Sequence, residues 1–386
     1  MTALPAGLHV GLNLIFLVPG ETGGMETYAR ELIPRLAAAA PQVRFTAFVN
    51  REAAGTPGPW GTDLPAVTVP VRARQRAEWV RGEQLLLPRL ASREGIHLLH
   101  SLGGTAPWRG AATRVATIHD LNYLRVPEAH FGVRGLAMRA LVPLAARRSH
   151  RVIADSHSTA ADLVSLLGVP SERIDVVWLG AGGAPGRAPA LTTERRAALG
   201  IPPGPLLLSP SAKRPHKNLV RLIEAYAALP APRPALVIPG YPTPHEAELR
   251  DRAAALGAGD TVCFPGWVGA EDLDALHAAA AAVVFPSLYE GFGLPVLEAM
   301  QRGVPVACSS ASSLGEVAGD AALTFDPLDV PAMTAAMRRL LDDPAEAARL
   351  RAAGPRRAAT FTWEATAAGT LASYGRALAA RRALLA

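Results

Sequence analysis

The chain has 386 residues, a length sufficient for two globular domains. Of these residues 49% are hydrophobic and 19% are charged, a composition that excludes a disordered chain. No apolar run approaches the roughly 18 residues that span a bilayer, and the N-terminus lacks a basic segment leading into an apolar core, so we expect a cytoplasmic protein. The formal net charge of +6 is spread along the chain without zinc-ligand spacing or an aromatic ribonucleoprotein motif, which argues against nucleic acid as a partner.

The first half of the chain alternates strand-like and helical segments. Residues 9–18 are almost wholly apolar, as expected for a parallel strand covered on both faces. A glycine-containing loop at 19–24 follows, and the apolar residues of 25–40 then recur at helical spacing. This alternation predicts a doubly wound α/β domain. Its further strands are predicted at 45–49, 98–100, 115–119 and 152–155, with a helix at 134–148.

A loose segment at 180–189 is interpreted as the linker to a second α/β domain. We divide the chain into a first domain at 1–183, a second at 184–362 and a helical tail at 363–386 that we expect to pack back on the first domain. Two facing domains of this kind would hold a ligand in the cleft between them. The strands of the second domain are predicted at 206–209, 235–239, 262–264, 283–286 and 306–309, and its helices at 219–229, 244–256, 271–280 and 295–302.

Lysine and arginine are used very unequally. Of the 39 basic residues 37 are arginine, and the only lysines are Lys213 and Lys217. Two lysines within one five-residue stretch indicate positions at which arginine was not an acceptable substitute, with coincidence as the alternative. The only cysteines, Cys263 and Cys308, lie in strand-like stretches, so no disulfide framework is indicated.

Residues 285–300 contain the most informative pattern of the chain. A strand ends at Pro286, two glycines follow, and Pro295 occupies a position that the first helical turn favours. Free amide groups at such a helix N-terminus bind a phosphate or a developing anion. Glu290 lies before the loop and Glu298 lies one turn inside the helix, so both carboxylates could accept hydrogen bonds from sugar hydroxyls of one ligand.

The segment SLYEGFGLPVLEAMQRGVPVACSSASSLGEVAGDAAL, residues 287–323, resembles the E-x7-E core of glycosyltransferase family 4. Weaker similarity extends over nearly the whole chain and includes, in the expected order, segments 23–24, 117–120, 154–156, 213–217 and 264–268. The resemblance implies the GT-B fold, in which two Rossmann-like doubly wound domains face a cleft. It also implies that the first domain binds the acceptor and the second binds the nucleotide sugar.

The resemblance also implies roles for individual residues of the second domain. Glu298 would hold the donor ribose, and Glu290 would face the donor sugar. Backbone amides of the glycine loop would contact the diphosphate or sugar hydroxyls, and the 266–268 segment would border the base. The donor-binding candidates in these two segments are Phe292, Gly293, Leu294 and Val268.

In the first domain, Gly23 and Gly24 would let the backbone approach the donor diphosphate, a contact that a Cβ would block. His119, at the end of a strand, matches the family's histidine at the reacting centre. There it would position the sugar or stabilise its developing positive charge through its neighbours, with Asp120 to orient it. Without the family, the alternative is a strand-end histidine satisfied by the backbone.

The basic loop would neutralise the diphosphate, because the family has an arginine and a lysine there. Lys217 matches the lysine, but Ser211 occupies the expected position of the arginine. Lys213 or Arg214 would then supply the second charge. The sequence His216-Lys217-Asn218 resembles the loop of mannosyltransferases and deoxysugar relatives, which favours GDP-mannose or a similar donor.

No cofactor and no metal site is expected. Asp272 and Asp274 have the spacing of a metal-binding aspartate pair, but residues two apart on a helix face different sides, and the helix dipole explains acidic residues there. The expected reaction is metal-independent transfer of a hexose from a nucleotide diphosphate sugar to a hydroxyl, with retention at the anomeric carbon. The acceptor would be a glycan, a lipid-linked molecule or a small molecule.

Four alternatives remain open at this point. The chain could be another GT-B enzyme, such as a sugar-nucleotide epimerase or phosphorylase, or a non-catalytic sugar-nucleotide-binding scaffold. Glu290 could also be imagined as a covalent nucleophile. The basic stretch at 134–151 is interpreted as a structural helix with a solvated face, and peripheral contact with an anionic membrane is the alternative.

Overall fold

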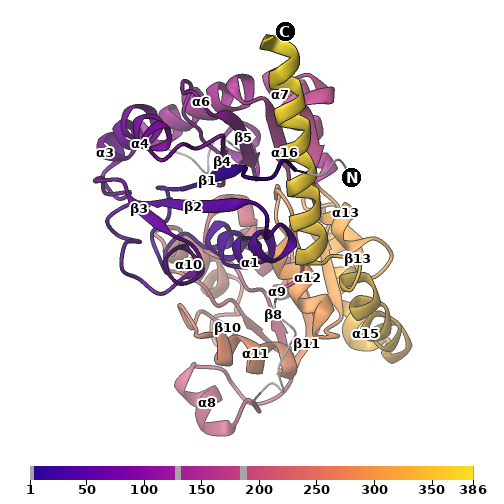
Figure 1. Cartoon of the computed structure of the whole chain (residues 1–386). Coiled ribbons are helices and arrows are strands. Elements are labelled where there is room, and N and C mark those ends of the chain that lie inside the picture. Colours follow the sequence, from indigo (N-terminus) through magenta and orange to yellow (C-terminus); the bar gives the residue numbers. More distant parts are fainter. Residues whose placement is uncertain (1–3, 127–131, 183–188, 386) are drawn as a thin grey trace. The chain divides into compact units, whose positions relative to one another are not determined.

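Parallel β-sheets form the centre of each of the two units into which the chain folds (Figure 1). The computed structural model describes residues 4–126, 132–182 and 189–385, without the side chains of 132–136, 384 and 385. Unit 1 contains most of the first 180 residues together with the C-terminal segment from Thr362, and unit 2 is built mainly from Ala181–Phe361. The predicted boundary between residues 183 and 184 lies outside the described residues.

The sheet of unit 1 has seven parallel strands in the order β3-β2-β1-β4-β5-β6-β7. The chain builds outward from β1 to β3 and then returns to begin β4 on the other side of β1. The order therefore reverses between β1 and β4, and the loops that follow strands at such a reversal are the usual ligand-binding position in doubly wound folds. The strands are β1 (His9–Leu14), β2 (Arg44–Val49), β3 (Ala66–Thr68), β4 (Leu98–Ser101), β5 (Thr113–Ile118), β6 (Arg151–Ala154) and β7 (Ile174–Val176).

Helices connect these strands, as parallel pairing requires. In the predicted basic helix, now α6, Arg147 donates a hydrogen bond to the carbonyl of Leu167 in the same unit. No helix among the described residues combines the length and apolar character needed to span a bilayer. The helices are α1 (Gly24–Ala39), α2 (Pro59–Thr62), α3 (Arg76–Arg81), the π-helical turn η1 (Gly82–Leu86), α4 (Leu87–Arg93), α5 (Asn122–Arg125), α6 (Gly132–Arg148), α7 (His157–Leu167) and the 3-10 turn η3 (Ser171–Arg173).

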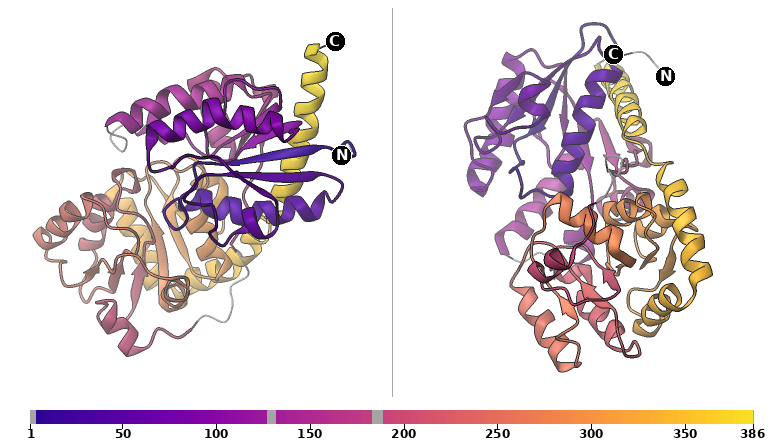
Figure 2. Two further views of the ribbon diagram at one scale, coloured as in Figure 1. Left: turned by 60° about the vertical axis from the view of Figure 1, so that its left-hand side comes forward. Right: turned by 90° about the horizontal axis from the view of Figure 1, so that it is seen from below.

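The C-terminal helix α16 (Trp363–Leu385) belongs to unit 1, where it packs against α1, β5 and β6. Figures 1 and 2 show it as the long yellow helix. Thr366 Oγ1 donates to the carbonyl of Trp178 at 2.7 Å, and Ser373 Oγ donates to Asp175 at 2.7 Å. The last segment of the chain is therefore part of the fold of unit 1, although it follows unit 2 in sequence.

The sheet of unit 2 has six parallel strands in the order β10-β9-β8-β11-β12-β13, and its order reverses between β8 and β11. The strands are β8 (Leu206–Leu208), β9 (Ala235–Val237), β10 (Val262–Cys263), β11 (Ala280–Phe285), β12 (Val306–Ser309) and β13 (Leu323–Phe325). The helices are α8 (Thr193–Ala198), the 3-10 turn η4 (Pro215–Lys217), α9 (Leu219–Ala227), α10 (His245–Ala255), α11 (Ala270–Ala279), α12 (Leu294–Gln301), α13 (Leu314–Ala318), α14 (Val330–Asp342) and α15 (Pro344–Ala358).

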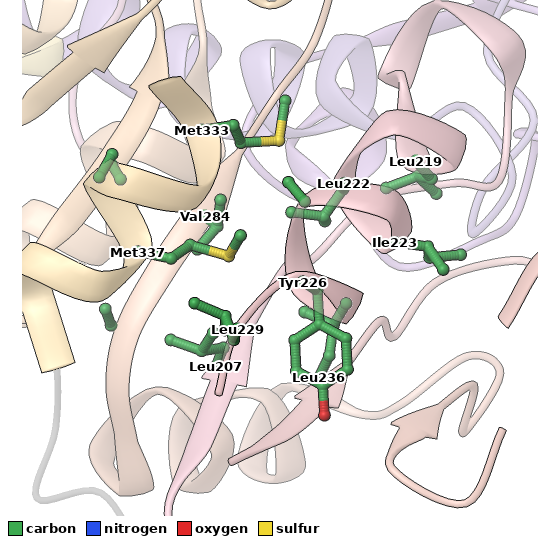
Figure 3. Packing of buried hydrophobic residues seen from close by; sticks show 14 of the residues in the cluster. Leu207, Leu219, Leu222, Ile223, Tyr226, Leu229, Leu236, Val284, Met333 and Met337 are labelled. Carbon is green, nitrogen blue, oxygen red and sulfur yellow. The ribbon is translucent and has the colours of Figure 1, made fainter. Parts of the chain in front are cut away.

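The core of unit 2 explains why α9 forms where it does (Figure 3). Its apolar residues recur at the i, i+3, i+4 and i+7 positions of one helical face, which faces the sheet. Leu207, Leu236 and Val284 from the strands, with Met333 and Met337 of α14, belong to the same buried cluster. The residues that α9 contributes are Leu219, Leu222, Ile223 and Tyr226.

The two parallel sheets confirm the predicted α/β class with two doubly wound domains. Each predicted strand overlaps an observed one, but residues 15–18 leave β1, because the side-chain oxygen of Asn13 accepts the Ile15 amide at 3.2 Å and Leu17 N donates to the Leu14 carbonyl. The strands β3, β7 and β13 were not predicted. Each has three residues and is only partly buried, whereas β8 and β9, which are equally short, are fully buried and are visible in the sequence as apolar runs.

Candidate active site

The loops after β8 and β11 meet at the point where the strand order of unit 2 reverses. The amide of Leu288, after β11, donates to the carbonyl of His216, after β8, at 2.8 Å. Beside this contact, Lys217 Nζ lies 2.6 Å from Glu290 Oε1, and the two side chains are only 16% and 15% exposed. The structure thus joins two of the predicted catalytic residues, which the sequence separates by 73 positions.

Several interactions stabilise this ion pair. Burial raises the pKa of the Glu290 carboxyl, but the charges of Lys217 and His216 and the hydrogen bond from Lys217 outweigh burial and lower that pKa below its usual value. The Lys217 ammonium also lies 5.2 Å from the centre of the Phe285 ring, a cation–π distance. A partly buried lysine at this position places positive charge where a phosphate of a ligand would be stabilised.

The N-terminus of α12 begins at Gly293, whose φ of 112° lies in the region that favours glycine. A Cβ at this position would lie 2.6 Å from Leu314 Cδ2, so the close approach of α13 also requires glycine. The amides of Phe292, Gly293 and Leu294 donate no hydrogen bond to another described residue. Such amides, together with the helix dipole, form an anion-binding site.

Two serines hold the loop before α12 in place. Ser312 Oγ accepts the amide of Glu290 at 2.8 Å, and Ser313 Oγ lies 2.9 Å from the carbonyl of Glu290 and 2.8 Å from that of Phe292. Ser312 adopts a φ of 53°, which is uncommon for a residue with a side chain. Sequence reasoning assigned no role to these serines. The unusual φ of Ser312, which only the structure reveals, is the signal that marks this pair.

Glu298 lies on α12, one turn from its N-terminus, and is half-buried. Burial, with a contribution from Asp274, raises its pKa, and the nearby Arg302 charge opposes this shift. Its carboxylate accepts no hydrogen bond from a described residue, because Arg302 donates to the Glu298 main-chain carbonyl and to Asp274 instead. A partly buried carboxylate with unused oxygens is suited to accept hydrogen bonds from ligand hydroxyls.

The structure separates Lys213 and Arg214, which the sequence offered as alternative phosphate ligands. Lys213 is fully buried, and its Nζ donates to the carbonyl of Gly240 and lies 3.9 Å from Glu246 Oε2. Burial lowers the pKa of Lys213 to about 8. The structure therefore does not bring Lys213 to the Lys217–Glu290 pair, whereas Arg214 is exposed in the same loop.

Val268 lies after β10 and is buried, while its neighbour Trp267 is 64% exposed. The Trp267 ring stacks on that of Tyr241, with centroids 4.4 Å apart. The predicted base-contacting segment thus presents an aromatic surface beside a buried valine.

Asp272 and Asp274 each pair with a different arginine, Arg195 and Arg302 respectively. Among the described residues, no group of three or more His, Cys, Asp or Glu side chains is arranged to hold a metal ion.

In unit 1, the loop after β1 ends at Gly23, which is the N-cap of α1 and has a φ of 63°. Gly23 and Gly24 are both exposed, and a Cβ on Gly23 would meet no atom within 4 Å. The backbone conformation at this position, rather than crowding within the unit, therefore requires glycine.

His119 directly follows β5, and the pairing of Ile118 with Ala154 places it beside Asp155 at the end of β6. His119 Nδ1 lies 2.6 Å from Asp155 Oδ2, and Nε2 lies 2.7 Å from the Leu102 carbonyl. Both partners are acceptors, and an imidazolium that donates from both ring nitrogens satisfies this geometry. Burial lowers the pKa of His119, but the charge and hydrogen bond of Asp155 and the Leu102 carbonyl outweigh it and raise the pKa above its usual value.

The prediction that Asp120 orients His119 is wrong. Asp155 takes this role, and Asp120 acts on the ring only through its charge, while its Oδ1 accepts the amide of Asn122 at 3.0 Å. The physical reason is the direction of the side chains, since successive residues at the end of a strand point to opposite faces.

A series of side-chain contacts extends from His119 to α16. Tyr28 of α1 meets the His119 ring edge-on, with centroids 5.0 Å apart, and its hydroxyl lies 3.1 Å from Thr117 Oγ1. The same Thr117 oxygen lies 2.8 Å from His100 Nε2, and His100 Nδ1 lies 2.8 Å from the Tyr374 hydroxyl of α16. Burial, followed by the charge of His119, lowers the pKa of His100 to about 3, so this second ring is neutral. None of these partners was predicted from the sequence.

Two known families match successive parts of the chain. Residues 22–181 match the family described as "Glycosyltransferase Family 4", and residues 192–357 match "Glycosyl transferases group 1". Among solved structures, the chain is similar to sucrose-phosphate synthase from Thermosynechococcus elongatus, with a TM-score of 0.76, 23% identity and coverage of 97% of this chain and 100% of the other. It is also similar to Anabaena HepE in complex with UDP-glucose, with a TM-score of 0.72, 21% identity and coverage of 95% and 100%.

Sequence relatives are more informative about activity. O-antigen chain mannosyltransferase B from Escherichia coli is 33% identical over 272 residues, which cover 67% of this chain and 69% of that protein. D-inositol 3-phosphate glycosyltransferase from Salinispora arenicola is 30% identical over an alignment of 403 positions, which covers 94% of this chain and 89% of that protein. Because this second match extends over most of both chains, the relationship is one of family and not of fold alone: the chain belongs to glycosyltransferase family 4 and is a glycosyltransferase with the GT-B fold.

Proposed function

We propose that this glycosyltransferase moves a hexose from a nucleotide diphosphate sugar to an acceptor hydroxyl, with retention at the anomeric carbon and without a metal or cofactor. The observation that carries the proposal is the Lys217–Glu290 ion pair, whose glutamate lies in the loop that also contains the free amides at the N-terminus of α12. Stabilising a departing diphosphate is the main electrostatic task of such a reaction, and fixed donors supply most of that stabilisation.

The donor is assigned to unit 2. The Lys217 ammonium and the amides of residues 292–294 contact its diphosphate, and Glu298 accepts hydrogen bonds from its ribose. Glu290 faces the donor sugar, and Val268 borders the base. Arg214 is the better source of the second positive charge, since it is exposed while Lys213 donates to Gly240 in the interior.

In unit 1, we assign Gly23 and Gly24 the role of letting the backbone approach the diphosphate. The acceptor is also assigned to this unit. His119 receives a positioning role. Both of its ring nitrogens already have partners within the unit, so neither is free to take the acceptor's proton. A phosphate oxygen of the departing diphosphate therefore accepts the proton as the acceptor oxygen attacks.

Mannose from GDP-mannose is the first donor to test, with a deoxyhexose next. The similarity to O-antigen chain mannosyltransferase B and the His216-Lys217-Asn218 sequence both support this choice. The acceptor class remains a glycan, a lipid-linked molecule or a small molecule.

The test is incubation of the purified chain with GDP-mannose, GDP-fucose or UDP-glucose, with and without a panel of mannosides and lipid-linked sugars. Release of the nucleoside diphosphate only when an acceptor is present would distinguish transfer from epimerisation and from mere binding. EDTA should leave the rate unchanged. NMR of the product should show the anomeric configuration of the donor, and an inverted product would contradict the retaining assignment.

A further inference from the structure

A cavity lies in unit 1 at the end of the sheet where β4 and β5 begin. Its volume is about 470 Å³, and all of its lining residues belong to unit 1. His119 follows the opposite end of β5, and the six residues of this strand span about 20 Å at about 3.3 Å per residue. The cavity is therefore separate from the candidate reaction centre of unit 1. The lining residues that determine its chemistry are Ile96, His97, Thr113, Leu378, Arg381 and Arg382.

Two consecutive arginines of α16 line this cavity without an acidic partner. Arg381 Nη1 donates to Thr113 Oγ1 at 3.3 Å, and neither Arg381 nor Arg382 forms an ion pair with a carboxylate in the described part of the chain. Less than two turns earlier on the same helix, Arg376 does have such a partner, since its Nε lies 2.9 Å from Asp175 Oδ1. No Asp or Glu side chain of a described residue lines the cavity. The two arginines thus lack the acidic partner that Arg376 has.

Arg114 adds to this positive charge, and the pKa values of Arg114 and His150 reflect it. Burial, followed by the charges of Arg381 and Arg148, lowers the pKa of the Arg114 guanidinium. Burial, followed by the charges of Arg114 and Arg381, lowers the pKa of His150 to about 4. The Arg114 side chain donates to main-chain carbonyls, including that of Arg148 at 3.0 Å, and these carry no net charge. A bound oxyanion would offset the repulsion among these groups.

We propose that this cavity binds the phosphoryl group of a small phosphorylated solute. Guanidinium groups bind phosphate through paired hydrogen bonds, and the Thr113 hydroxyl offers a further polar contact. Ile96 and Leu378 provide an apolar wall for the rest of the molecule. The volume lies within the range of about 300–1,000 Å³ typical of small-molecule sites. The proposal does not depend on the reaction assigned above.

The experiment is calorimetric titration of inorganic phosphate into the full-length chain carrying Lys217→Ala, which removes one of the phosphate contacts proposed for unit 2. We expect binding to persist in this background and to weaken at least tenfold when Arg381→Gln is added. Arg382→Gln, at an exposed position, should also weaken binding. This variant replaces Arg381→Gln in the test if Arg381→Gln does not fold. Arg351→Gln, at an exposed arginine of α15, is the matched control and should leave the affinity unchanged.

Two results would overturn the proposal. The first is an absence of phosphate binding by the folded chain, or binding that Arg381→Gln and Arg382→Gln leave unchanged. The second concerns the source of the phosphoryl group and uses sedimentation with phosphatidylglycerol vesicles. Vesicle binding that requires Arg381, without binding of soluble phosphate, would assign the arginines to a lipid surface instead of a solute.

Discussion

The loops that follow β11 in unit 2 and β5 in unit 1 both carry candidate site residues, but they differ in how many of their polar groups are already satisfied. In unit 2, the Glu298 carboxylate and the amides at the start of α12 make no hydrogen bond with a described residue. In unit 1, both ring nitrogens of His119 have acceptors within 2.7 Å. Unit 2 therefore has unused donors and acceptors for a ligand, whereas unit 1 holds a charged ring in a fixed orientation.

This difference separates binding from positioning. Groups without partners gain hydrogen bonds when a ligand arrives, so they contribute directly to affinity. A side chain with all of its hydrogen bonds made gains little from a ligand, but it is preorganised. Substitutions in unit 2 should consequently change donor binding and turnover strongly, and those around His119 should act through its charge and orientation.

The largest expected effect is that of Lys217→Ala. The substitution removes the positive charge assigned to the departing diphosphate and leaves the Glu290 carboxylate without its partner, so the rate of transfer should fall about 100-fold. Lys217→Arg keeps the charge but replaces a compact ammonium with a broad planar group, and should cost about tenfold. Initial rates of nucleoside diphosphate release measure both.

Arg351→Ala, at an exposed arginine of α15, serves as the control for charge loss and should have nearly the wild-type rate. If Lys217→Ala retained full activity, the contrast between the two regions would fail, because unit 2 would have lost its main anion-binding group without consequence.

Gly293→Ala should reduce stability by about 1–3 kcal/mol, because its φ of 112° is strained for alanine and the added Cβ would lie 2.6 Å from Leu314. Urea unfolding followed by tryptophan fluorescence measures the loss. Gly269→Ala is the matched control in unit 2, since Gly269 is also an N-cap but has a φ of −68° and open space around its Cβ. Equal losses in the two variants would show that the conformation at Gly293 is not the cause.

Asp155→Asn should lower the pKa of His119, because it removes the largest opposing influence to burial. The folded-state pKa of His119 is raised above 6.5, so the stability from its protonation is complete below about pH 6.5 and is lost as the pH rises through the folded-state pKa. In the variant, that contribution should be smaller and its loss should be complete at lower pH. NMR titration of the ring measures the pKa directly.

Asp120→Asn is the control for this prediction, because Asp120 contributes only through its charge and is the smallest of the causes. Its effect on the His119 pKa should therefore be smaller than that of Asp155→Asn. The reverse order would restore Asp120 as the residue that orients the ring.

The sequence was informative wherever neighbouring residues decide the geometry. Gly293 and Pro295 mark the start of α12 because helix N-termini favour particular backbone conformations, and Glu290 and Glu298 lie on either side of them. Apolar periodicity likewise predicts α9, since the buried face alone determines that pattern.

The sequence was uninformative where contacts join distant segments. Lys213 and Lys217 look equivalent in the sequence, but a carbonyl 27 positions away takes up the Lys213 ammonium. The partnership of His119 with Asp155 depends on the register between β5 and β6, which no local pattern specifies. The contact between His100 and Tyr374 spans 274 positions and could be known only from the packing of α16.

The division of labour between Glu298 and Glu290 is the most direct test of this account. Calorimetric titration of GDP, and of UDP if GDP does not bind, should show that Glu298→Ala weakens nucleotide affinity by about 1.5–3 kcal/mol, the usual value of a charged hydrogen bond. Glu290→Ala should leave that affinity within about threefold while lowering the rate of transfer, because Glu290, unlike Glu298, is assigned to the donor sugar. Equal losses of nucleotide affinity in the two variants, or no loss in Glu298→Ala, would contradict the assignment of the donor to unused groups of α12.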